Sequence, residues 1–363
     1  MTKQLRTGRT TGTCAAAAAM AGTTVLLTGT FPTEVKVPLP PGGSLIVPIE
    51  RIENDGDTVR VTVLKDGGDD PDATHECEIQ AVVVLDNQTA TPLTISVDGG
   101  VGVGRVTLPG LPVPVGEAAI NPEPLKQIEQ AVRSCAQSME TGHIAVLVEV
   151  PEGEHIAQKT MNSRLGIIGG ISILGTQGVV KPFSHDSWKA TIEKGLDVAR
   201  AQGLTHIVFT TGRRSERFYQ RTHPGLPDFA FIQVADFFEF AMQAAAERGF
   251  THVSWSVFFG KLVKQAQGLR YTHAKTHAVD FGRLADWCAE VGVRACYMED
   301  IRSANTAVQV LGLLTGEPER ALLIQLLLKQ ATKAADQFAG GTCSVAYTVF
   351  DFEGHKLAES ETD

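Results

Sequence analysis

From residue 143 onward, apolar runs of strand length alternate with amphipathic helical segments, and this alternation limits the fold more than any other feature of the sequence. Strands and helices in alternation predict a largely parallel sheet that is covered by helices on both faces. One expected helix has an apolar face made of Trp188, Ile192, Leu196 and Ala199. The runs expected as strands are HIAVLVEV, HIVFTT, FIQV, THVSWSVFF, the shorter RACYM and a closing SVAYTVFDF.

The first part of the chain has a different pattern, with short β-rich runs between residues 33 and 107 that are separated by Pro, Gly and Asp. Alternating apolar and polar residues, as in TVRVTVL, indicate half-buried strands. A chain of 363 residues is also longer than one core usually serves. We therefore predict an α/β and α+β protein. A β-rich α+β domain would cover residues 1–142, and a Rossmann-like α/β domain with a largely parallel sheet and C-terminal helices would cover residues 143–363.

The stretch from Lys159 to Pro182 places five glycines among apolar residues, at positions 166, 169, 170, 175 and 178. Such density implies tight turns or a close approach of the backbone to another group. Periodicity alone favours a buried crossover, whereas polar residues within the stretch favour a pocket wall. These polar residues are Lys159, Thr160, Asn162, Arg164, Ser172 and Thr176.

Near the N-terminus, Thr11 or Thr13 can cap a helix over residues 14–21, which the following glycine would end. Arg6 and Arg9 precede this helix, so their guanidinium groups and the first helix amides could converge on an anion. Two solvated arginines beside a capped helix are the alternative. The sequence alone favours neither.

Two polar loops in the β-rich part are further candidates. KDGGDDPDATH, residues 65–75, has the composition of a solvated turn, but it could also hold a cation or supply a general base. DGGVGVGRVTLPG contains D-x-G-x-G-x-G at residues 98–104, a pattern common in loops that bind S-adenosylmethionine. Such a loop should open into a helix, whereas extended chain follows here. We expect a hairpin or a substrate-facing loop.

Three loops are expected at the carboxyl ends of the parallel strands, where ligands of such sheets bind. TTGRR carries Arg213, VADFF carries Asp236, and FFGKLVK carries Lys261 and Lys264. These loops bring both basic and acidic side chains to one edge of the predicted sheet.

Composition excludes several functional classes. A net charge of −9 argues against nucleic-acid binding. Six cysteines without CxxC pairs indicate a reduced, intracellular chain, and no run of about 18 strongly apolar residues predicts a membrane span. We therefore expect a cytoplasmic protein without membrane contact. His273 and His277 would share a helix face, but no third ligand is evident, and we expect no protein-bound metal.

The chain contains, in order, the segments LRTGRTTGTCAAAAA, KDGGDDPDATH, GVGVGRVTLPGLPVPVGEAAINPEP, AQKTMNSRLGIIGGISILGTQGVVKP, ADFFEF, FGKLVKQAQG and THAKTH. In this order they resemble the CbiD family, the cobalt-precorrin-5B C(1)-methyltransferases of anaerobic cobalamin (vitamin B12) biosynthesis. The resemblance covers nearly the whole length and departs from the family pattern at Glu76, Gln177 and residues 256–259.

This resemblance implies that a methyl group passes from S-adenosylmethionine, the cosubstrate, to C1 of cobalt-precorrin-5B, which gives cobalt-precorrin-6A. Cobalt would be present only as part of this corrinoid substrate. A non-catalytic corrinoid-binding carrier of the same pathway is the alternative. A homo-oligomer is compatible with the sequence.

The resemblance also implies roles for the candidate residues. The corrinoid bears carboxylates while the chain is net negative, so the face of the protein that binds the corrinoid should be locally basic. The residues expected to bind the substrate there are Arg6, Arg9, Arg164, Arg213, Lys261 and Lys264. The methyl donor would contact Gly169, Gly170, Gly175, Thr176 and Asp236. A general base, if one acts, would be Asp69, Asp70 or His75.

Overall fold

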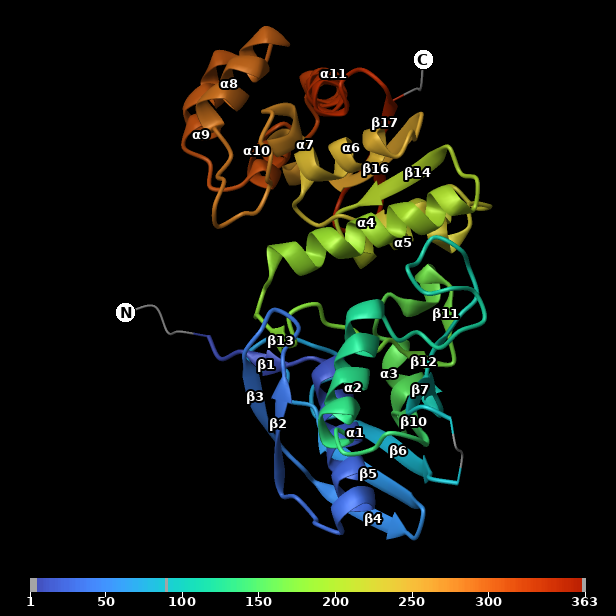
Figure 1. Ribbon diagram of the computed structural model, residues 1–363. Helices are drawn as coiled ribbons and strands as arrows, with labels where there is room; N and C mark the ends of the chain where they lie inside the picture. The colour runs from blue at the N-terminus through green and yellow to red at the C-terminus, as the bar shows by residue number, and fades with distance from the viewer. Residues whose placement is uncertain (1–4, 89–90, 361–363) are drawn as a thin grey trace. The chain divides into compact units, whose positions relative to one another are not determined.

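The chain forms two compact units, Met1–Ser184 (unit 1) and His185–Asp363 (unit 2), in this computed structural model (Figure 1). The structure describes residues 5–88 and 91–360. Each unit has its own large apolar core. The predicted mixture of helices, antiparallel strands and parallel strands is confirmed.

The predicted domain boundary between residues 142 and 143 is corrected by the structure. The run HIAVLVEV forms β10 (His143–Glu149), which lies between β6 (Glu78–Asp86) and β7 (Thr94–Gly99) in the sheet of unit 1. A strand that is buried on one face has the same apolar alternation in either unit, so its pattern could not show which sheet it joins.

Unit 1 is an α+β arrangement in which two helices cover one face of a five-stranded sheet. The sheet order is β4-β5-β6-β10-β7, antiparallel except for β10 beside β7. The remaining elements are β1 (Gly8–Arg9), α1 (Thr11–Thr28), β2 (Glu34–Pro38), β3 (Ser44–Pro48), β4 (Arg51–Asp55), β5 (Thr58–Leu64), β8 (Gly102–Val103), β9 (Arg105–Val106), α2 (Pro122–Cys135), α3 (Gly153–Ala157), η1 (Asn162–Leu165), β11 (Ile167–Ile168), β12 (Gly170–Ile171) and β13 (Val179–Val180).

The alanine-rich helix α1 is the centre of the unit 1 core. Its small side chains let it lie close to β5, where Val59, Val61 and Val63 are fully buried and each contribute about 2 kcal/mol through burial. The helix does not end at Gly22, as predicted, but at the cap Gly29. A Cβ on Gly22 would lie 2.7 Å from Val83 on the sheet, so this glycine permits close helix–sheet packing.

Helix α1 also has the length and apolarity that a membrane-spanning helix needs, the one such helix within residues 5–88 and 91–360. In the structure, 72% of that window is buried inside the protein. Its apolar residues are therefore part of the core of unit 1.

Unit 2 contains a second five-stranded sheet in the order β15-β14-β16-β17-β18, with the first four strands parallel and β18 antiparallel. This confirms the largely parallel sheet. Its elements are α4 (His185–Ala201), β14 (His206–Thr210), α5 (Arg213–Thr222), η2 (Asp228–Ala230), β15 (Phe231–Gln233), α6 (Phe238–Glu247), β16 (His252–Phe258), α7 (Phe259–Ala266), α8 (Phe281–Glu290), η3 (Ala295–Tyr297), α9 (Met298–Arg302), α10 (Ala307–Leu313), α11 (Glu319–Ala339), β17 (Ser344–Phe350) and β18 (Lys356–Glu359).

Helices cover both faces of this sheet. Phe209, Trp255 and Tyr347 face the larger core, which α4, α6, α7 and α11 complete, whereas Val208 and Phe350 face the opposite side and pack with α5. The predicted strand RACYM is instead η3 and the start of α9. Tyr297 and Met298 from this run pack against the core of unit 2, so tertiary contacts override a weak strand preference.

The two strands that follow β14 in the sequence lie on opposite sides of it in the sheet, with β15 on one side and β16 on the other. In open parallel sheets, the crevice at such a reversal, beyond the carboxyl ends of the strands, is the usual ligand site. The fold therefore directs attention to the loops that follow β14, β15 and β16.

Candidate functional site

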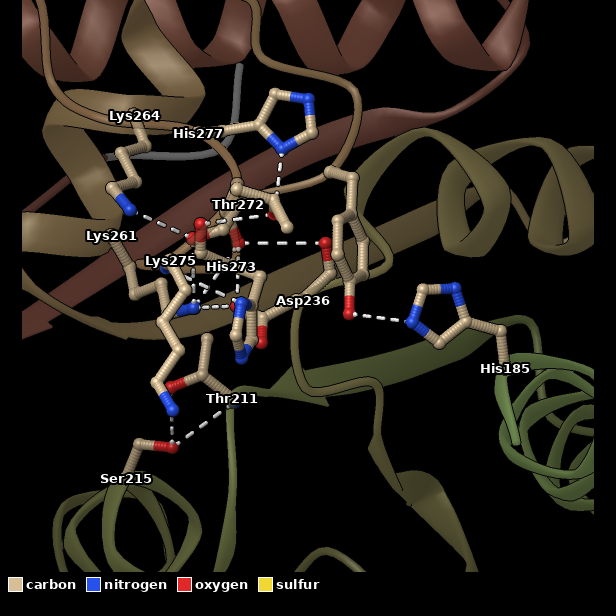
Figure 2. A network of polar contacts seen from close by, with 12 residues as sticks. His185, Thr211, Ser215, Asp236, Lys261, Lys264, Thr272, His273, Lys275 and His277 are labelled. Atoms are coloured by element: carbon tan, nitrogen blue, oxygen red, sulfur yellow. Dashed lines mark hydrogen bonds and ion pairs between the residues drawn. The ribbon is translucent and has the colours of Figure 1, made fainter. Parts of the chain in front are cut away.

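Polar side chains gather at the carboxyl ends of these three strands (Figure 2). Thr211 follows β14, Asp236 follows β15, and Lys261 lies in the first turn of α7, directly after β16. Ala235, just before Asp236, has a φ of +48°, so the backbone turns sharply where the carboxylate is presented. The predicted position of Asp236 and Lys261 at one sheet edge is confirmed.

An ion pair between Asp236 and Lys261 is the centre of this cluster. Lys261 Nζ also donates to Thr272 Oγ1 at 3.2 Å and to the Thr272 carbonyl at 3.3 Å. Thr272 Oγ1 donates to Asp236 Oδ1 at 3.1 Å, and its backbone N–H donates to the Asp236 carbonyl at 3.0 Å. All three ammonium protons of Lys261 are thus used within the protein.

Lys264, one turn later on α7, donates from Nζ to the same Thr272 carbonyl at 3.0 Å. Burial, together with a smaller effect of the nearby Lys264 cation, lowers the pKa of Lys261 to about 8. Burial also lowers the pKa of Lys264. The cluster therefore holds two ammonium groups and one carboxylate, a local surplus of positive charge in a chain that is net negative.

Aromatic rings support the segment that carries Thr272. The Tyr271 ring lies 5.0 Å from that of Phe237 and 5.1 Å from that of His185, measured between centroids. The Tyr271 hydroxyl and His185 Nε2 are 3.2 Å apart. After Thr272 the chain is mostly exposed as far as Asp280. The side-chain amide of Gln267 holds the Asp280 backbone, because it donates to the Asp280 carbonyl and accepts from the Asp280 N–H. The segment between these two fixed points is an exposed loop of the kind that often contacts ligands.

Sequence reasoning missed Thr272 and Tyr271, because YTHAKTH was considered as a metal-binding pattern and THAKTH as a family segment, and neither gave these two residues a role. A buried threonine that accepts from two lysines has no sequence signature. Nor do any three His, Cys, Asp or Glu side chains gather as metal ligands within residues 5–88 and 91–360.

Arg213 is the first residue of α5, beside the same strand ends. Behind it, the Thr211 N–H donates to Ser215 Oγ at 3.2 Å, and the buried Glu216 accepts from Thr210 and Gln233. These bonds fix the first turn of α5 and hold Arg213 at the edge of the sheet.

The acidic loop in unit 1 acts mainly as a scaffold. Asp69 accepts from the Arg6 N–H at 2.7 Å, Asp70 accepts from the Phe183 N–H at 2.8 Å, and His75 Nδ1 accepts from the Gly67 N–H at 3.0 Å. Because Nδ1 of His75 is an acceptor, its neutral ring carries the proton on Nε2. His75 is therefore the least suited of the three predicted bases.

The two N-terminal arginines do not converge with helix amides on an anion. Arg6 pairs with Asp66 and thereby lowers the pKa of that carboxyl group to about 2. The helix α1 is capped by Thr10, and the N–H of Gly12 donates to the Leu174 carbonyl at 3.1 Å. Arg9 donates to a backbone carbonyl through Nη2, while its buried Nε has no partner among the described residues.

Cys14, near the start of α1, is fully buried, and burial raises its pKa to about 12. The thiolate is therefore disfavoured at neutral pH. Cys14 therefore serves as a small packing residue in the core of unit 1.

The glycine-rich stretch packs against other backbone segments. A Cβ on Gly170 would lie 2.0 Å from the Gly102 carbonyl oxygen, and one on Gly175 would lie 2.4 Å from Thr10. The buried Asn162 donates to the Gly170 carbonyl at 3.0 Å. These contacts account for the glycines at 170 and 175 through packing alone, which supports the crossover interpretation.

The other predicted residues of this stretch are differently placed. Gly169 has a φ of +84°, and a Cβ added to it would meet no atom within 4 Å, while Thr176 is exposed, unlike Gly170 and Gly175. Arg164 lies in η1. All of them belong to unit 1, whereas Asp236 belongs to unit 2, so the predicted donor contacts are divided between the two units.

Comparison with known proteins identifies the family. The family model CbiD matches residues 1–182, and the model of the CbiD C-terminal domain matches residues 271–361. The chain belongs to the CbiD family. Between the two matched ranges lie Asp236, Lys261 and Lys264.

Curated relatives in this family match almost the whole chain. A cobalt-precorrin-5B C(1)-methyltransferase of Nitratidesulfovibrio vulgaris is 48% identical over 98% of this chain and 93% of its own length. Another protein of that name, from Geobacillus kaustophilus, is 43% identical over 99% of this chain and 95% of its own. A crystal structure of a cobalamin biosynthesis protein (cbiD) from Archaeoglobus fulgidus matches at 27% identity over 72% of this chain and 79% of its own, with a TM-score of 0.39.

Proposed function

We propose that this protein methylates C1 of cobalt-precorrin-5B, with S-adenosylmethionine as the methyl donor, in cobalamin biosynthesis. The observation that carries the proposal is 48% identity, over nearly the full length of both chains, to a protein named for this reaction. The products are cobalt-precorrin-6A and S-adenosylhomocysteine. Cobalt enters with the substrate.

The chemistry needs positioning more than a protein nucleophile. The electron-rich C1 of the ring attacks the sulfonium methyl, the new C–C bond forms as the C–S bond breaks, and the bonding pair stays on sulfur. Holding the two partners in line and excluding water can supply most of the rate. A base would take a ring proton only if the methylated ring must lose one, and Asp69 or Asp70 suits this role better than His75.

We place the methyl donor at the carboxyl edge of the unit 2 sheet. Its strand order and the reversal at β14 are those of doubly wound nucleotide-binding sheets, and this supports a Rossmann-like role for the unit. Asp236 would accept from the ribose hydroxyls through Oδ2, since its Oδ1 already accepts from Lys261 and Thr272.

The corrinoid carboxylates would contact basic groups. Lys264 is the best candidate, because its Nζ makes one hydrogen bond and has two donors left. Arg9, Arg164 and Arg213 remain proposed contacts because of their positive charge. Lys261 is better described as a positioning residue, because its ammonium protons are all used. Arg6, paired with Asp66, shapes the acidic loop.

The test is to incubate the protein with cobalt-precorrin-5B and methyl-labelled S-adenosylmethionine and to follow label into the corrinoid. Methyl transfer should depend on the protein and on both substrates. A protein that binds the corrinoid tightly but transfers no label, beside an active relative as control, would be the carrier instead.

The donor site has its own test. Asp236→Ala should weaken binding of S-adenosylhomocysteine tenfold or more in calorimetry. An unchanged affinity in a folded variant would exclude Asp236 from the donor site.

A further inference from the structure

A buried ammonium group without an acidic partner lies beside the Asp236–Lys261 pair. Lys264 is 8% exposed, and its Nζ makes one hydrogen bond, to the Thr272 carbonyl. Within residues 5–88 and 91–360, no carboxylate lies within ion-pair distance of this nitrogen, whereas Lys261 pairs with Asp236. Two of the three donors of Lys264 are therefore unused.

This arrangement is costly for the folded protein. A buried charge that lacks a counter-ion loses hydration without regaining it, which disfavours the folded state. A methionine would fill a similar volume at this position without that cost. Stability alone therefore does not explain a lysine at position 264, and a ligand that supplies negative charge does.

The geometry around Thr272 indicates the kind of ligand. Both lysine ammonium groups point toward its carbonyl oxygen, as Figure 2 shows. An oxygen atom between two ammonium groups is the environment that a carboxylate prefers. The carbonyl carries only a partial negative charge, so it leaves the surplus of one positive charge uncompensated. A carboxylate oxygen bound to Lys264 beside this carbonyl would balance the cluster.

We propose that Lys264 binds a carboxylate group of a ligand through the two donors that the protein leaves unused. The inference rests on the proposed function, which brings two sources of this chemistry to the protein: the amino-acid carboxylate of S-adenosylmethionine and the side-chain carboxylates of the corrinoid. Lys261 positions the site by holding Asp236 and Thr272. The exposed loop after Thr272 would give way as the carboxylate enters.

Calorimetry with matched ligand pairs tests the proposal. One pair is S-adenosylhomocysteine and its decarboxylated form, which keeps the amino group. The other is cobyrinic acid and its methyl ester. For one of the two pairs, Lys264→Met should weaken binding of the carboxylate ligand tenfold or more relative to wild type. The affinity for the member of that pair without the carboxylate should stay within twofold of the wild-type value. The pair that responds identifies the source of the carboxylate.

Controls separate this role from a structural one. Lys333→Met, at an exposed position of α11, should change neither pair, and thermal unfolding should show that Lys264→Met is folded. Lys264→Gln is a second variant that keeps a polar donor. Equal weakening of both members of each pair, or no weakening of any, would overturn the proposal, because Lys264 would then only hold the loop. If wild-type protein transfers methyl normally in that case, the proposed function stands and this inference alone fails.

Discussion

Lys261 is subject to opposing electrostatic effects. Its carboxylate partner Asp236 favours the ammonium form, whereas burial and the neighbouring Lys264 favour the neutral amine. Burial has the larger effect, and the pKa falls to about 8 from an ordinary value of 10.5. A pair of this kind is weak evidence for stability but a good means of fixing geometry.

The lowered pKa predicts how stability depends on pH. Between pH 8 and 10.5 the folded Lys261 is largely neutral while the unfolded one is still protonated, so the unfolded state binds more protons and stability rises with pH. The unfolding free energy of wild type, relative to Lys261→Met, should rise by about 1–3 kcal/mol across this window. Urea titrations at several pH values measure it. If the difference in unfolding free energy between wild type and Lys261→Met did not change with pH, Lys261 would not be desolvated.

Removal of the carboxylate should reveal the charge that it balances. Asp236→Asn leaves two lysines without an acidic partner and should lower the unfolding free energy by about 2 kcal/mol. The double variant Asp236→Asn, Lys261→Met should recover part of this loss, since one uncompensated cation is also removed. Chemical denaturation of the two single variants and the double variant gives the coupling energy. Strict additivity would contradict the pairing.

Among the elements, the glycine-rich crossover shows why glycines need not mark a ligand. Its residues run beside the loop at 98–104, where β12 pairs in parallel with β8, and its carbonyls accept from the first turn of α1. Gly170 is placed so that two backbones can touch, a role that only glycine can fill. The segment that most strongly indicated the family is thus largely architectural.

Two neighbouring glycines provide a matched test of this interpretation. Gly170→Ala would place a methyl group against the Gly102 backbone and should destabilise the protein by about 3 kcal/mol. Gly169→Ala meets no neighbour and bears only the cost of a positive φ, about 1 kcal/mol. Thermal and urea unfolding compare the two. Similar losses in both variants would show that Gly170 is not tightly packed.

At the scale of the whole molecule, each unit completes its own core. In unit 1 the central position of β10 between β6 and β7 makes the sheet depend on residues after 142. A strand in this position satisfies the backbone groups of both neighbours, so its loss would expose two strand edges.

Truncation can test where unit 1 ends. A fragment of residues 1–184 should unfold cooperatively on heating, as followed by circular dichroism, because it keeps the whole sheet and the crossover. A fragment of residues 1–142 should show no cooperative transition, since it lacks β10 and the partners of β8 and β9. A cooperative transition in the shorter fragment would restore the boundary predicted from the sequence.

The sequence by itself determined the local elements and their class. Periodicity indicated β5, β14, β16 and the helices between the later strands, because the spacing of apolar residues records which face is buried. It also placed Asp236, Lys261 and Lys264 at one sheet edge, since parallel strands present their carboxyl ends together. The order of its motifs indicated the family.

Only the tertiary structure decided which groups meet. The pairing of β10, the Gly170–Gly102 contact and the position of Thr272 between two lysines all join residues without a local pattern that specifies a partner. Local sequence sets backbone preference and burial, whereas partner choice depends on how separate surfaces fill the same space. For this reason the glycine-rich stretch was ambiguous in the sequence and became a packed crossover in the fold.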